Sequence, residues 1–270
     1  MSPALVQKRP SALAGTWYPS ESVRLREHVE AYLDTARHEG AGATTQPMAI
    51  VAPHAGLAYA GATAAHSFLS VKDRPDRIIL LGPAHRLAFQ GISVGAFSHY
   101  ACPLGELPVD QDTALTLRNR GLVCSISEAH TEEHCLEMMM PFILALWGRV
   151  SILPLLVGRA EPADVLRILE EVVTPGDLLV VSTDLSHFLT YDEARNKDLD
   201  TLHAVLEGRW KELGPRDACG YVGLGALIQF AHRRHFQGTL LDYRNSGDTS
   251  ADRVRVVGYG ALAYRSTDSK

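Results

Sequence analysis

The sequence predicts an α/β fold of three layers, α/β/α, with helices on both faces of a central, mostly parallel sheet. Short apolar runs rich in Val, Ile and Leu recur along the chain, as is typical of buried parallel strands. Segments with helical spacing of apolar residues alternate with these runs. No break in composition and no long linker divides the chain, so we expect a single domain over residues 1–270.

The elements are expected in a regular order. Residues 21–36 have helical spacing with charged faces, and the loose stretch 38–47 predicts a surface loop. Buried strands are predicted at 48–53, 77–83, 151–158 and 177–183, with closing strands at 240–244 and 253–264. Further helices are predicted at 57–69, 110–120, 134–147, 162–173, 192–206 and 221–235. The helix at 134 follows an acidic start, and the helix at 162 has proline in its first turn.

Charge and cysteine usage exclude several classes of protein. Lys and Arg number 26 against 31 Asp and Glu, so no basic surplus attracts nucleic acid or an anionic membrane. No apolar run is long enough to span a membrane or to serve as a signal sequence. The four cysteines contain no Cys-x-x-Cys pair, which argues against zinc-ribbon and thioredoxin motifs. Free thiols in a reducing compartment are the simplest interpretation, so we expect a cytoplasmic protein.

Chemistry-bearing residues follow three of the predicted buried strands. His54 follows the first, His85 the second, and Asp184-Leu185-Ser186-His187 the strand at 177–183. A single histidine at a strand end is more often structural, but three equivalent positions favour a shared site at the carboxyl edge of the sheet. Neutral imidazole is a common ligand of transition metals. Asp184 and His187 could supply a carboxylate and a general base, and they would share a face if a helix began there.

Two further segments carry candidate residues. Cys219 precedes an apolar helix, whose N-terminus would favour the thiolate and make it a third, anionic metal ligand. Packing alone explains Cys219 equally well. Glu133 and His134, with Glu137 one turn later, are interpreted as residues that orient a metal ligand or bind substrate. The alternative is acidic charge that complements a helix dipole.

In this order, these residues resemble the MEMO family, whose bacterial and archaeal members are often called AmmeMemoRadiSam system protein B. The matching stretches are AGTWYP (14–19), APHAGLAYAGATAAHSF (52–68), LGPAH (81–85), EEHCLEMMMPF (132–142), LPLLVG (153–158), STDLSHF (182–188), ACGYVGLGAL (218–227) and SGDTSADRVRVVGYGALAY (246–264). They span nearly the whole chain, and several are long and chemically unusual.

The resemblance implies an architecture similar to the class III extradiol dioxygenases, the LigB-like fold. It implies a metal site on His54, His85 and Cys219, with Asp184 lining the same pocket and His187 as the catalytic base. Fe(II) is the metal expected, with copper or zinc as alternatives. A small molecule or a peptide is the expected occupant of the pocket. The bacterial name also implies a pathway shared with AMMECR1-like and radical SAM proteins.

Two positions depart from the family pattern. Met139 stands where the family commonly has a second histidine, and Ala84 replaces a serine hydroxyl. Arg86 directly follows His85 and would favour an anionic substrate group. Neither departure changes a proposed ligand.

Three hypotheses for function follow. The first is a non-heme iron oxidoreductase, similar to a dioxygenase. Because one expected ligand is a thiolate, the ring-cleavage reaction of the extradiol dioxygenases is not carried over to this chain. The second is a protein that binds copper, a peptide or a partner without turnover. The third is a metal-assisted hydrolase, which ranks last because hydrolytic zinc sites seldom combine a thiolate with two histidines.

Overall fold

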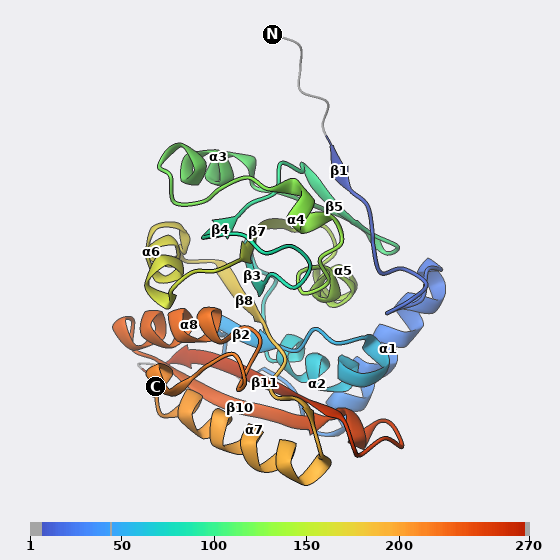
Figure 1. Cartoon of the computed structure of the whole chain (residues 1–270). Helices are drawn as coiled ribbons and strands as arrows, with labels where there is room; N and C mark the ends of the chain where they lie inside the picture. The colour runs from blue at the N-terminus through green and yellow to red at the C-terminus, as the bar shows by residue number, and fades with distance from the viewer. Residues whose placement is uncertain (1–6, 44, 268–270) are drawn as a thin grey trace.

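The fold is built around a mixed sheet, seen in a computed structural model that describes residues 7–43 and 45–267 (Figure 1). Within this part of the chain the main sheet has the strand order β10-β11-β2-β8-β3-β7-β4, and β9 pairs with β11. The central strands are mutually parallel: β2 (Ala49–Ala52), β8 (Asp177–Ser182), β3 (Arg77–Pro83) and β7 (Ser151–Val157). The flanking strands run antiparallel: β11 (Val256–Ser266), β10 (Phe236–Asn245), β4 (Ile92–Ser93) and β9 (His187–Leu189).

The central strands are buried on both faces, which explains their continuous apolar sequences. In β3, Ile78 and Leu80 pack into one core, whereas Ile79 and Leu81 pack into the other. Successive side chains of a strand point to opposite faces, so one apolar run supplies both layers.

Helices cover both faces of the sheet, as predicted. One core includes side chains of α1 (Ser22–His38), α2 (Leu57–Leu69) and α5 (Met140–Trp147). The other includes side chains of α3 (Gln111–Asn119), α6 (Pro162–Val172), α7 (Tyr191–Leu206) and α8 (Tyr221–Arg233). In Figure 1, α1, α2 and α5 lie on one side of the strands and α6, α7 and α8 on the other. The predicted three-layer α/β/α class is therefore confirmed.

A second, small sheet was not predicted from the sequence. It contains β1 (Lys8–Arg9), which runs parallel to β5 (His99–Cys102), and β6 (Gly105–Pro108), which completes a hairpin with β5. The remaining elements are a short helix and three 3₁₀ turns, namely α4 (Ser127–Thr131), η1 (Glu137–Met139), η2 (Trp210–Glu212) and η3 (Ser246–Asp248).

The structure also departs from the predicted elements in the helix expected at 134 and in the strand directions of the main sheet. The helix expected from residue 134 begins later, with η1 at Glu137 and α5 at Met140. The preceding backbone turns around the Glu133 carboxylate, which accepts hydrogen bonds from the amides of His134 and Cys135. The sheet also contains more antiparallel pairing than expected, because both of its edges are antiparallel.

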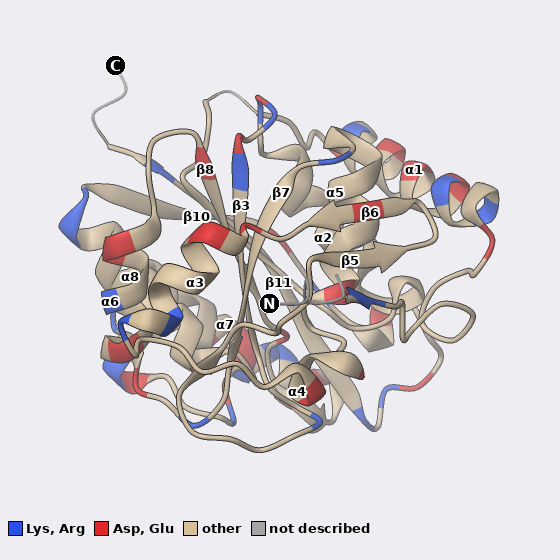
Figure 2. Cartoon of the chain, turned by 90° about the horizontal axis from the view of Figure 1, so that it is seen from above, with Lys and Arg blue, Asp and Glu red and all other residues tan. Residues whose placement is uncertain are grey.

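Charged residues of both signs are interspersed around the molecule (Figure 2). In the described ranges, no helix combines the length and the apolar character that crossing a bilayer requires. The central strands carry few charges in this view, as expected for a sheet buried between two helical layers.

Candidate metal centre

Three adjacent parallel strands deliver the predicted residues to one edge of the sheet. His54 lies two residues beyond the end of β2, His85 two beyond β3, and Asp184 two beyond β8. Because β8 pairs with both β2 and β3 in parallel, these equal offsets bring the three positions together.

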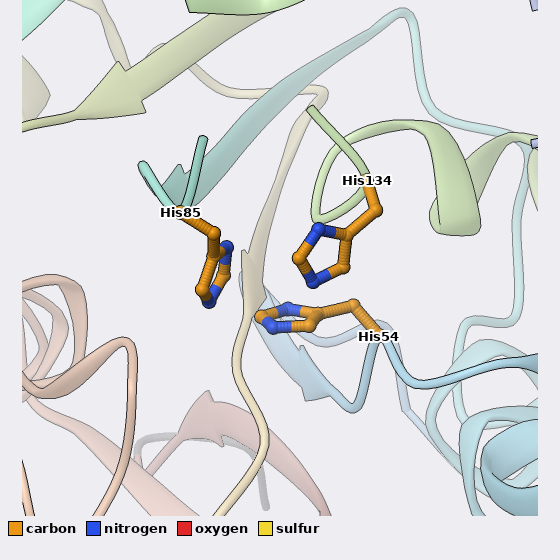
Figure 3. Close-up of side chains that lie close together, drawn as sticks. All are labelled: His54, His85 and His134. Atoms are coloured by element: carbon orange, nitrogen blue, oxygen red, sulfur yellow. The ribbon is translucent and has the colours of Figure 1, made fainter. Parts of the chain in front are cut away.

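A third histidine joins His54 and His85 at this edge. His134, from the loop between α4 and η1, points its imidazole toward the other two (Figure 3). The ring centroids lie 5.1 Å apart for His54 and His85, 5.1 Å for His54 and His134, and 4.3 Å for His85 and His134. One potential ligand atom from each histidine lies within 4.8 Å of the others, close enough for one metal ion. The sequence placed His134 in a supporting role, whereas its geometry is that of a potential ligand.

The orientation of His54 is fixed by a relay of hydrogen bonds. Its Nδ1 lies 2.8 Å from Ser182 Oγ, and Ser182 Oγ donates to the carbonyl of Cys135 at 2.7 Å. Because the serine proton is donated to Cys135, Ser182 accepts from Nδ1–H, and the lone pair of the His54 ring lies on Nε2. Sequence reasoning assigned no role to Ser182, although a hydroxyl at the end of an otherwise apolar strand was a visible signal.

Glu133 performs the same task for His85. Its Oε1 lies 3.0 Å from His85 Nδ1, and its Oε2 accepts the His85 amide at 2.6 Å. Burial alone would raise the pKa of Glu133, but its close contacts with His134 and His85 outweigh burial and hold its pKa far below the usual range. The resulting carboxylate favours the tautomer of His85 with its Nε2 lone pair free, an arrangement common behind metal-bound histidines.

His134 is held less firmly. Its Nδ1 lies 3.0 Å from Glu133 Oε1, yet this nitrogen has no hydrogen bond of acceptable geometry within the described ranges. Trp17 packs on the ring at a centroid distance of 4.7 Å and adds an aromatic wall.

Asp184 is buried and contacts His54. Its Oδ1 accepts the backbone amide of His54 at 2.7 Å, and its Oδ2 lies 4.0 Å from His54 Nε2. Burial raises the pKa of Asp184, against the opposing influence of His187 and the His54 amide. Burial, together with the neighbouring His85 and His134, lowers the pKa of His54 well below its usual value. His54 is therefore neutral at pH 7, as a metal ligand must be.

Cys219 also contacts His54. Its Sγ is 3.3 Å from His54 Nε2 and accepts the backbone amide of Asp184 at 3.3 Å. Among the described residues, Cys219 is not part of the three-imidazole set, although it touches one of its members.

Burial opposes the thiolate that the helix N-terminus was expected to favour at Cys219. Burial, together with the adjacent Asp184 carboxylate, raises the pKa of the Cys219 thiol to about 12. Helix α8 begins two residues later, and this burial outweighs the helix terminus.

His187 is exposed and begins β9, and the segment from Asp184 to His187 is not helical. The two residues therefore do not share a helix face. The segment is extended because Leu185 and Ser186 exchange backbone hydrogen bonds with Gly258.

The remaining predicted residues lie at the margin of this cluster. The Glu137 carboxylate pairs with Arg9 at 2.5 Å and binds the amides of Ala12 and Leu13, so it anchors the N-terminal segment. The Arg86 side chain is exposed, and its backbone amide donates to Glu133 at 3.2 Å.

Arg9 organises the segment that carries Glu133 and His134, a role that the sequence did not reveal. This arginine is 1% exposed. Its guanidinium donates to the carbonyls of His130 and Glu133 at 2.6 and 2.7 Å and to Glu137.

Three convergent imidazoles with a thiol beside one of them form a donor set that suits a transition metal. Nitrogen ligands suit iron, copper and zinc alike, and the softer sulfur favours Cu(I) or zinc. His85, Glu133 and Cys135 form a second convergent group. There Cys135 donates to the Pro83 carbonyl, and burial raises its pKa well above the usual value, so the imidazole cluster is the better candidate.

The fold and this cluster define a three-layer α/β protein with a candidate metal centre at the carboxyl edge of its sheet. A family model described as Memo-like protein matches residues 9–263. A MEMO1 family protein of Desulfurococcus amylolyticus is 30% identical over 96% of this chain and 99% of its own length. The corresponding protein of Aeropyrum pernix is 32% identical over 94% and 98%, and that of Thermotoga petrophila 30% identical over 93% and 98%. The chain therefore belongs to the Memo-like protein family, as its motifs predicted.

Proposed function

We propose that this chain is a redox metalloprotein that holds non-heme iron, with chemistry similar to that of a dioxygenase. The observation that carries the proposal is the convergence of His54, His85 and His134, whose ligand atoms lie within 4.8 Å of one another. Ser182 and Glu133 contact the Nδ1 atoms of His54 and His85 and so orient the two rings. The Nε2 atom of each ring would then be available to bind a cation.

The residues would divide the work in the following way. His54 and His85 would hold the metal, with His134 or Cys219 as a third ligand. A bound Fe(II) would supply open coordination positions for O₂ and substrate. His187, exposed at the start of β9, would exchange protons with solvent. Asp184, whose pKa is raised by burial, could hold a proton beside His54.

Copper binding without turnover is the second candidate. The observation that favours it is the contact of 3.3 Å between Cys219 Sγ and His54 Nε2, since a thiolate and an imidazole are good ligands for Cu(I). Zinc in a three-histidine site would instead support the hydrolase hypothesis.

The test is the metal content of protein purified without oxygen. We expect about one iron per chain, lost from His54→Ala and His85→Ala. Parallel Cys219→Ala and His134→Ala variants identify the third ligand. Copper retained by His134→Ala and lost from Cys219→Ala would favour the second candidate. If the native chain holds no metal even after reconstitution with Fe(II), Cu(I) or Zn(II), the proposal is wrong.

A further inference from the structure

A cavity of about 630 Å³ opens beside the candidate metal centre, on the side of Cys219. It lies at the carboxyl ends of β3, β7 and β8 and beside the first turn of α8. Cys219 and Ser182, which both contact His54, are among the residues that line it, whereas the three imidazoles themselves do not line it. This volume falls within the usual range of small-molecule sites.

The buried walls of the cavity are apolar. Leu81, Val157, Val181 and Val222 line it, and each of them is buried. The half-buried Phe89 adds an aromatic surface. Such walls favour the hydrocarbon part of a ligand, because burying apolar surface is favourable. They disfavour a polar group, because these side chains offer no hydrogen bonds to a ligand.

The exposed lining of the cavity carries charge of both signs. Arg159 is exposed there, and its guanidinium has no hydrogen-bond or ion-pair partner in residues 7–43 and 45–267. Glu161 and Asp164 line the same cavity, and Asp164 accepts the amide of Glu161 at 3.0 Å. A free guanidinium matches a carboxylate in charge and geometry. The two acidic residues repel any anion, and they repel a doubly charged group such as a phosphate monoester more strongly than a single carboxylate.

We propose that this cavity binds small organic monocarboxylates with an apolar aliphatic or aromatic body. The carboxylate would pair with Arg159, and the apolar end would point toward Cys219. The proposal rests on the proposed function only in placing that apolar end beside a metal, since binding itself requires the cavity and Arg159. Arg86, the cation that the sequence suggested for this purpose, does not line the cavity.

The experiment measures binding by ¹⁹F NMR with three probes: 4-fluorobenzoate, 4-fluorobenzamide and 4-fluorophenyl phosphate. Each is titrated into the full chain with and without added metal. We expect 4-fluorobenzoate to bind most tightly. Arg159→Gln should weaken it about fivefold, the scale of one partly exposed ion pair, while leaving 4-fluorobenzamide unchanged. The matched control Arg86→Gln should have no effect.

A second pair of variants tests the location. Ala88→Trp fills the lining of the cavity at an exposed position and should abolish binding of 4-fluorobenzoate. Ala96→Trp, also exposed but outside the cavity, should not. Equal binding of the carboxylate and the amide, tighter binding of the phosphate, or indifference to both Arg159→Gln and Ala88→Trp would overturn the proposal.

The outcomes separate this proposal from the metal proposal. Binding that depends on Arg159 in a chain that takes up no metal would support the carboxylate site while refuting the proposed function. Binding that appears only with metal and ignores Arg159→Gln would mean that the carboxylate coordinates the ion. That result would refute the carboxylate site and leave the metal centre intact.

Discussion

Replacing Arg9 with methionine is expected to cost about 3–5 kcal/mol of folding stability, the usual penalty for removing one partner of a buried ion pair. The change would leave the Glu137 carboxylate without its cation in a site that is 0% exposed. The carbonyls of His130 and Glu133 would each lose a donor as well. Because these residues flank His134, metal affinity should also fall, by about tenfold or more.

Two controls separate local from global effects. Lys8→Met removes the neighbouring exposed pair with Glu106 and should cost at most about 1 kcal/mol. Arg77→Met breaks another clamp, with Asp110 and Asp177, at the opposite ends of the strands. It should lower stability while leaving metal affinity unchanged.

Urea unfolding measures the stability of each variant, and competition with a chromophoric chelator measures its metal affinity. A loss below about 1 kcal/mol for Arg9→Met would refute the reasoning, since Glu137 would then be solvated or neutral. Equal losses of metal affinity in Arg9→Met and Arg77→Met would refute the local role of Arg9.

The same ion pair predicts a dependence of stability on pH. Burial raises the pKa of Glu137, but Arg9 and Tyr18 outweigh burial and lower it below its usual value. A depressed carboxyl pKa stabilises the fold above the unfolded value, about 4.3, and this contribution is lost as the pH falls below it. The native chain should therefore lose stability as the pH falls below about 5, and Arg9→Met should show a smaller loss.

Three further outcomes are expected. Ser182→Ala removes the acceptor that orients His54 and should weaken metal binding by about 10- to 100-fold in a chelator competition; an unchanged affinity would contradict the relay. Metal binding through Cys219 must expel a thiol proton, because the pKa of that thiol is raised to about 12. Calorimetry in buffers of different ionisation heat should detect this released proton, and metal affinity should rise with pH. In Cys219→Ala, the proton release that comes from this thiol should disappear. Gly258→Ala would drive a Cβ into the buried carboxylate of Asp198 and should cost about 1–3 kcal/mol in thermal or urea unfolding.

The layered fold and the positions of His54, His85 and Asp184 were readable from the sequence for one physical reason. Buried parallel strands are written as continuous apolar runs, and their carboxyl ends must meet at one edge. Polar residues that follow each strand by the same number of positions must therefore lie close together at this edge, once the strands are recognised. The helix at 57–69 and the strand at 77–83 were predicted with the bounds observed.

What the sequence could not supply depends on contacts between distant segments. The small sheet joins Lys8–Arg9 to the hairpin at 99–108, which no local pattern encodes. The pKa of the Cys219 thiol depends on how deeply the surrounding segments of the protein bury it. The position of a helix boundary in the sequence does not give that depth.

His134 illustrates how two carboxylates four residues apart can shape a site outside regular structure. Helical spacing in this segment suggested a helix from residue 134, yet Glu133 turns inward to His85 and to its own following amides. Glu137 faces the N-terminal segment instead and pairs with Arg9. Arg9 in turn binds the Glu133 carbonyl, so one buried cation fixes both ends of the turn that presents His134. Arg9 lies 124 and 128 positions before Glu133 and Glu137 along the chain, so the N-terminal segment helps to position the third imidazole of the candidate metal centre.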